Sequence, residues 1–177
     1  MLTEPLPNSL DVRKAATRGV SVNGVLKPLN LQHFRDLLAD DEGAIEANLV
    51  FSRDQENRFL VTVTVTADVA LVCQRCLESM PAHLEASNVL AVVWDDEYAR
   101  QLPQGLEPLI VGDELCNLWN IVEEELILGM PAFSYHEEDN CNELLVGLNQ
   151  TTPPEVAVSE KPNPFNVLEQ LKPGKKD

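Results

Sequence analysis

The strongest constraint on the fold is a run of three neighbouring segments with the sequence pattern of β-strands. In residues 45–51 apolar side chains alternate with polar ones, which is the period of a half-buried strand. Residues 59–72 are rich in Val and Thr, whose β-branched side chains favour an extended backbone. A third such run extends from about residue 77 to 93. Because the links between the three are short, they predict an antiparallel meander and not a parallel βαβ sheet.

Short helical patterns lie before these strands. Asn8 or Ser9 could cap a helix over residues 11–18, and Asn30 could cap a second helix with apolar residues at 31, 34, 37 and 38. Between them, the alternation over 20–25 predicts a short strand.

Further short elements are predicted after the strands. Residues 95–102 predict a short helix and 109–111 a short strand, while 115–130 predict a longer helix that Pro131 ends. In that helix the consecutive Glu123, Glu124 and Glu125 predict a solvated face. We therefore expect an α+β fold: an antiparallel sheet, which could curl into a partial barrel, flanked by short helices, with a flexible C-terminal tail.

The composition changes near the C-terminus, which predicts three regions. Residues 1–147 would form a single α+β domain, 148–160 a polar, Pro-containing linker, and 161–177 a docking segment. Within that last segment, Asn163 is a suitable cap and Pro164 a suitable first helical residue. The apolar face of this short helix would order only by docking, either on a partner or on the chain's own sheet; that face comprises Phe165, Leu168 and Leu171.

Acidic residues greatly outnumber basic ones. The 177 residues contain 29 Asp and Glu against 13 Lys and Arg, a formal net charge of −16. Residues 94–143 hold 13 of the acids and a single base, Arg100. Carboxylates repel phosphates, so this region is a poor candidate for coating nucleic acid and a better one for attracting a basic protein. The alternative is a solvated face that only keeps the chain soluble.

Four residues have the chemistry and spacing of a zinc site. Cys73 and Cys76 form a Cys-x-x-Cys pair between two predicted strands, and His136 and Cys141 could complete a Cys₃His set. The alternative is a reduced pair of thiols without metal. A redox centre lacks the helix N-terminus that lowers a thiol's pKa in such enzymes, and Arg75 could either stabilise a thiolate or contact a partner. We expect no cofactor other than, at most, zinc.

Searches for other sites are negative. The sequence has no glycine-rich phosphate loop, no Gly-x-Ser-x-Gly and no His-Glu-x-x-His, so we expect no enzyme. No segment approaches the ~20 apolar residues of a membrane helix. Since Met1–Pro5 lacks the features of a signal peptide, a cytoplasmic location is expected and no membrane partner.

Three segments together resemble one family. They are residues 73–77, the helix end at 122–131 and the terminal 163–172, and their order and spacing are similar to those of the bacterial YceD family, the large ribosomal RNA subunit accumulation proteins. The likeness runs over nearly the whole chain. It implies a cytoplasmic, non-enzymatic factor needed for synthesis, processing or stability of 23S ribosomal RNA. Many relatives carry a second close cysteine pair, whereas this chain has only Cys141, so that His136 would be the fourth ligand.

The resemblance and the charge together predict a partner. A strongly acidic factor would act through proteins on the pre-50S ribosomal particle, holding a basic ribosomal protein or assembly factor. Two alternatives remain: a zinc- or thiol-dependent RNA-processing enzyme, or a direct rRNA-binding protein. Direct binding would require convergence of six bases, namely Arg13, Lys14, Arg18, Arg53, Arg58 and Arg75.

Overall fold

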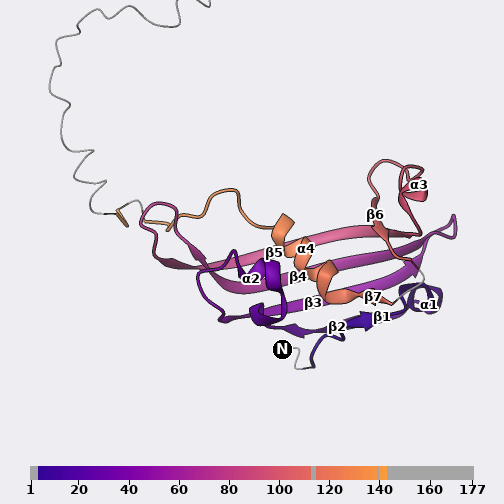
Figure 1. Cartoon of the computed structure of the whole chain (residues 1–177), viewed down its shortest axis with the longest axis horizontal. Helices are drawn as coiled ribbons and strands as arrows, with labels where there is room; N and C mark the ends of the chain where they lie inside the picture. The colour runs from indigo at the N-terminus through magenta and orange to yellow at the C-terminus, as the bar shows by residue number, and fades with distance from the viewer. Residues whose placement is uncertain (1–3, 113–114, 139, 143–177) are drawn as a thin grey trace, which may run out of the picture. The chain divides into compact units, whose positions relative to one another are not determined.

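The structure is a computed structural model that describes residues 4–112, 115–138 and 140–142. In the described part five strands form one open sheet in the order β2-β3-β4-β5-β6 (Figure 1). Their bounds are Ser21–Leu26 for β2, Gly43–Arg53 for β3, Phe59–Val72 for β4, Ser79–Val93 for β5 and Glu107–Ile110 for β6. Two further strands, β1 (Ser9–Leu10) and β7 (Cys116–Asn117), pair with each other.

The helices of the described part are short. They are α1 (Val12–Arg18), α2 (Gln32–Arg35), α3 (Asp96–Ala99) and α4 (Leu118–Leu128), with a 3₁₀ turn at Pro28–Asn30. All but one gather on one face of the sheet; the exception, α3, lies in the connection beside β6 and buries no residue (Figure 1). The core lies between this face and the helices α1, α2 and α4, and its fully buried side chains include Phe34, Leu49, Phe51, Val63, Leu118 and Leu126. The α+β class is confirmed, with a sheet that stays open instead of curling into a partial barrel.

The three predicted strands are confirmed, with one difference in topology. β4 has the predicted bounds, β3 extends beyond the predicted 45–51 at both ends, and β5 begins at Ser79. β6 corresponds to the strand predicted at 109–111, but it pairs parallel with β5, so the sheet is not wholly a meander. The connection over 94–106 contains α3 and is long enough to return the chain to the same end of the sheet.

Two predicted helix caps are wrong. Asp11, and not Asn8 or Ser9, caps α1, because its side chain accepts a hydrogen bond from the Lys14 N–H at 3.0 Å while Ser9 belongs to β1. The helix predicted over 31–38 is reduced to α2, and Asn30 does not cap it. The Asn30 side chain instead accepts from the Lys27 N–H at 2.8 Å in the preceding turn. α4 starts later than predicted, after Asn117, whose side chain accepts from the Trp119 N–H at 2.9 Å.

The solvated face predicted for the three consecutive glutamates is also wrong. Only Glu124 is exposed, whereas Glu123 and Glu125 are 8% and 6% exposed. The Glu123 carboxylate accepts hydrogen bonds from the backbone N–H groups of His33 (2.6 Å) and Phe34 (3.0 Å) at the start of α2. Burial raises the pKa of Glu125, and the Asn88 side chain, which donates to it at 3.1 Å, partly offsets this rise.

The outer edge of β2 is covered by the N-terminal segment. The Leu6 N–H donates to the Val25 carbonyl at 3.1 Å, and the Val25 N–H donates to the Glu4 carbonyl at 2.9 Å. This close approach needs a glycine at position 24, where a Cβ would lie 2.5 Å from the Leu6 nitrogen and 2.6 Å from its Cα.

Gly24→Ala is therefore expected to displace the Glu4–Leu6 segment and expose the Leu6 side chain. Overpacking of this kind lowers the free energy of unfolding by about 1–3 kcal/mol. Thermal unfolding and amide exchange at Leu6 and Val25 measure the effect. Gly112→Ala is the matched control, because a Cβ there would meet nothing within 4 Å; equal stability of the two variants would contradict the expectation.

Among the described residues no helix combines the length and apolar character needed to cross a bilayer. The predicted linker 148–160 and docking segment 161–177 lie outside the described residues, as does the C-terminal tail.

Candidate functional site

The turn between β4 and β5 presents two thiols on one side. The Cys73 N–H donates to the Glu78 carbonyl at 2.9 Å, and the Leu77 N–H donates to the Cys73 carbonyl at 2.8 Å. Leu77 closes this turn with a positive φ of 64°. Cys73 is buried and Cys76 is half-buried, so that both sulfur atoms lie beneath the loop that follows α4.

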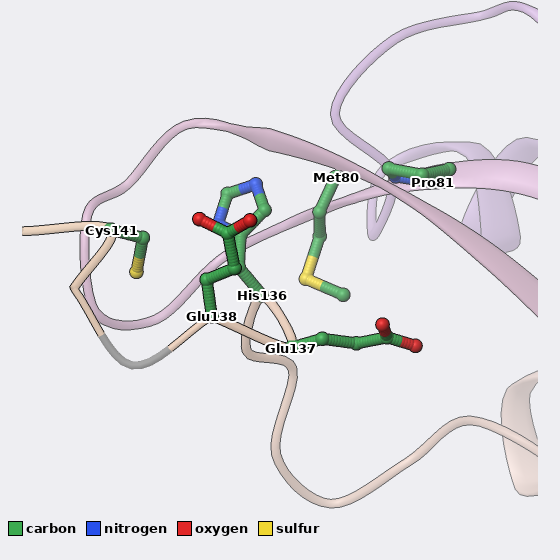
Figure 2. A pocket seen from close by; sticks show the side chains of 6 residues that line it. All are labelled: Met80, Pro81, His136, Glu137, Glu138 and Cys141. Atoms are coloured by element: carbon green, nitrogen blue, oxygen red, sulfur yellow. The ribbon is translucent and has the colours of Figure 1, made fainter.

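One backbone hydrogen bond and the side chain of Arg75 connect that loop to the turn. The Gln74 N–H donates to the Ser134 carbonyl at 2.8 Å. The guanidinium of Arg75 donates through Nη1 to the Glu138 carbonyl at 2.9 Å and lies 5.2 Å from the centre of the Tyr135 ring. These contacts bring His136 and Cys141 to the two thiols; both residues are seen on the loop in Figure 2.

The four side chains form a cluster with the dimensions of a metal site. The ligand atoms of Cys73, Cys76, His136 and Cys141 all lie within 4.8 Å of one another. The Cys73 and Cys141 sulfur atoms are 3.9 Å apart, and the Cys76 sulfur is 3.4 Å from His136 Nδ1. Around a tetrahedral zinc, with Zn–S of about 2.3 Å and Zn–N of about 2.0 Å, these separations would be about 3.8 Å and 3.5 Å. These two separations therefore match those of a tetrahedral zinc site, and the four ligand atoms lie close enough together to converge on one ion.

The electrostatics of the cluster also suit a cation. Burial raises the pKa of the Cys73 thiol, but backbone N–H groups of Cys76, Arg75 and His136 donate to its sulfur, and its pKa falls to about 5. Burial and the two neighbouring thiols raise the pKa of Cys141. A bound cation would offset the repulsion that raises the pKa of Cys141 and would favour its thiolate, which is the form that binds metal.

The arrangement does not provide a thioredoxin-type redox site. Cys73 and Cys76 lie in a turn between antiparallel strands and not at the start of a helix, as the sequence predicted. Four protein ligands are typical of structural zinc, which has no open position for a substrate, whereas catalytic zinc has three ligands and a water. The chemistry that this set supports is therefore a cross-link between the β4–β5 turn and the loop after α4.

The other predicted site residues have different positions. Arg75 contacts the loop and the Cys141 sulfur (3.7 Å), so it stabilises the cluster, and contact with a partner stays a prediction. The predicted docking residues lie outside the described part of the chain: Asn163, Pro164, Phe165, Leu168 and Leu171. The fourth cysteine, Cys116, is buried and takes no part in the cluster.

The six bases that direct RNA binding would need do not all converge. Arg53 ends β3, where its guanidinium donates to the Thr17 hydroxyl of α1 at 3.1 Å, and Arg58 directly precedes β4. Arg75 lies at the opposite end of β4. Lys14 is ion-paired with Asp11 (2.8 Å) and Arg58 with Glu56 (2.9 Å).

The sequence analysis missed the cavity beside the cluster. A cavity of about 420 Å³ is lined by Met80, Pro81, His136, Glu137, Glu138 and Cys141 (Figure 2). A second, of about 410 Å³, includes Phe133 and Tyr135 among its lining residues. The only signal for the second cavity in the sequence is the pair of aromatic residues Phe133 and Tyr135, in a polar loop that follows the helix-ending Pro131.

Comparison with known proteins identifies the family of the chain. Residues 61–172, which include all four cluster residues, match the family described as "Large ribosomal RNA subunit accumulation protein YceD". The chain belongs to the YceD family. It is 31% identical to the large ribosomal RNA subunit accumulation protein YceD of Haemophilus influenzae over 172 residues, which cover 94% of this chain and 96% of that relative. No solved structure matches the chain.

Membership confirms the resemblance of the three segments. The YceD name describes a factor in accumulation of large-subunit ribosomal RNA and does not describe an enzyme. The family match includes residues 163–172, where the sequence analysis placed the docking helix, although this part lies outside the described residues.

Proposed function

We propose that this chain supports accumulation of 23S ribosomal RNA without catalysis, by holding a basic ribosomal protein or assembly factor on the pre-50S particle. The family name supports the link to large-subunit ribosomal RNA. Such a role would place the chain in the cytoplasm. The observation that carries the protein-binding part of the proposal is the distribution of charge over the sheet.

Exposed carboxylates follow the side of the sheet formed by β5, β6 and α4. Asp96 and Glu97 lie in α3 after β5, Glu107 begins β6, and Glu124 is the exposed glutamate of α4. Glu137 and Glu138 continue the series in the loop beside the Cys/His cluster. Arg13 of α1 also reaches this side, where its guanidinium donates to the Val111 and Gly112 carbonyls and lies over the Trp94 ring. Such a series attracts cationic segments and repels phosphate groups.

In this proposal zinc is structural. Cys73, Cys76, His136 and Cys141 would hold the ion, which would fasten the loop carrying Glu137 and Glu138 against the β4–β5 turn. The shape of the acidic surface would then depend on the cluster. The C-terminal segment 161–177 would add a second contact through its Phe165, Leu168 and Leu171 face, tethered by the linker.

The test is co-sedimentation of the tagged chain with pre-50S particles from growing cells. We expect the tagged chain to co-sediment at low salt and to dissociate as ionic strength rises, because contacts between exposed charges are screened. A chain truncated after Glu160 is expected to co-sediment less well and to support less 23S rRNA. The proposal fails if binding ignores salt, if RNase alone releases the chain while the particle's proteins stay assembled, or if the purified chain cleaves a transcript.

A further inference from the structure

One edge of the sheet is open over most of the length of β5. β6 pairs with β5 only from Leu90 to Val93. Over the described residues, no strand pairs with this side of β5 from Ser79 to Val89 (Figure 1). The opposite edge of the sheet is covered by Glu4–Leu6. An unpaired edge offers N–H and C=O groups to which another chain can add a strand.

The hydrogen bonds of β5 determine which of its residues direct their backbone N–H and C=O groups away from β4, toward the open edge. The Val93 carbonyl accepts from the Val111 N–H at 2.8 Å on the β6 side. The pairing of β5 with β4 has no bulge, and alternate residues direct their backbone groups to the same side. The backbone groups of His83, Glu85 and Ser87 therefore also point away from β4. Pro81 belongs to the same alternate set of residues. Proline has no N–H, but at this position an N–H would point away from β4, so no hydrogen bond to β4 is lost.

A groove lies along this open edge. The cavity of about 410 Å³ separates Met80–Glu85 of β5 from the loop after α4, and it is lined on the loop side by Gly129, Pro131, Phe133 and Tyr135. Gly129 lets the end of α4 approach β5, since a Cβ there would lie 3.1 Å from the Ala86 Cβ and 3.5 Å from the Glu85 carbonyl oxygen. The end of α4 therefore covers the Glu85 carbonyl. Phe133 is 69% exposed and stacks on Tyr135, with ring centroids 6.3 Å apart. An added strand would place alternate apolar side chains against these rings.

The charges around the groove select its occupant. Glu137 and Glu138 are exposed and line the neighbouring cavity of about 420 Å³, which shares Met80 and Pro81 with the groove. Neither forms an ion pair with another described residue. Phosphates would be repelled there, and a second copy of this chain would bring like charges together. Lys or Arg side chains of an extended segment would instead find carboxylates.

We propose that the open edge of β5 and this groove bind an extended, Lys/Arg-rich segment of a protein as an added strand. The backbone groups of His83 and Ser87 supply hydrogen bonds on either side of the end of α4. Phe133 and Tyr135 contact the apolar side chains of the segment, and Glu137 and Glu138 pair with its cations. The inference rests on the proposed function, in that it names the surface that would hold the basic partner.

The test uses the purified full chain and an array of overlapping 12-residue peptides that cover the large-subunit ribosomal proteins. We expect binding to Lys/Arg-rich extended segments. The best peptide is then N-methylated either at its odd-numbered or at its even-numbered amides. One of the two sets should weaken binding at least tenfold, because only every second amide of an added strand faces β5. Ser87→Pro should weaken binding by a similar factor without breaking the β4–β5 ladder, since the lost N–H points outward.

Matched charge reversals complete the design. Glu137→Lys with Glu138→Lys should reduce peptide binding at least tenfold, whereas Glu42→Lys with Glu46→Lys, the same charge change at exposed positions outside the groove, should reduce it much less. If Ser87→Pro does not fold, the methylated peptides still test strand addition.

Three results would overturn the proposal. One is equal binding of the peptides methylated at the odd-numbered and at the even-numbered amides. Another is self-association of the peptide-free chain that Ser87→Pro abolishes, which would make a second copy the occupant. The third is displacement of the bound peptide by a 12-nucleotide RNA. Because the assay contains no ribosomal particle, its failure is distinct from failure of co-sedimentation, which tests the proposed function.

Discussion

Purified without added metal, the chain is expected to contain one zinc ion per molecule, and Cys73→Ser is expected to remove it. Loss of a directly bonded thiolate should weaken zinc binding by more than the roughly 10–100-fold caused by changes in outer-shell partners. Zinc present at 100 times its dissociation constant stabilises the folded state by about 2.7 kcal/mol. Chelation should therefore lower Tm by roughly 5–10 °C for a domain of this size. Elemental analysis and thermal unfolding with and without chelator measure both effects.

Cys116→Ser is the matched control, because Cys116 is a buried thiol outside the cluster. It is expected to retain one zinc ion, whatever it does to Tm. A second signature is local: amide exchange should rise after chelation at Gln74, whose N–H donates to Ser134 across the turn. The metal assignment would be contradicted if the unsubstituted chain contained no zinc after purification, or if the Cys73→Ser chain retained its ion.

The parts of the fold that are periodic in the sequence were predictable. The alternation over β3 and the Val/Thr run of β4 predicted both strands, because side chains of a half-buried strand alternate between core and solvent. Four residues with the chemistry of a zinc site also pointed to one cluster, although 60 residues separate Cys76 from His136. Ligand chemistry does not depend on distance along the chain.

The parts that depend on tertiary contacts were not predictable. The parallel pairing of β6 depends on where the connection through α3 returns the chain, and no local pattern encodes that path. The open edge of β5 follows from the shortness of β6, and the groove beside it depends on Gly129 approaching Ala86. Helix propensity likewise does not predict that Glu123 of α4 accepts hydrogen bonds from the first N–H groups of another helix, α2.

Glu123→Ala is expected to lower the free energy of unfolding by about 2–4 kcal/mol, since hydrogen bonds to a charged group are each worth about 1.5–3 kcal/mol and the change leaves buried donors without acceptors. The donors are the backbone N–H groups of His33 and Phe34, and Phe34 is fully buried in the core. The first N–H groups of a helix have no partner within it, so α2 depends on this carboxylate of α4. Urea unfolding and amide exchange at Phe34 measure the loss.

Glu124→Ala is the matched control: the same truncation one residue along, at an exposed position, should change stability by at most about 0.5 kcal/mol. Glu123→Gln keeps one carbonyl acceptor and should lie between the two. If capping of α2 is the cause, exchange at Phe34 should accelerate more in Glu123→Ala than exchange at Val63 in β4, which is protected by the sheet. Equal stability of the Glu123→Ala and Glu124→Ala chains would show that α2 does not need the carboxylate, and that its N-terminal amides are satisfied in another way.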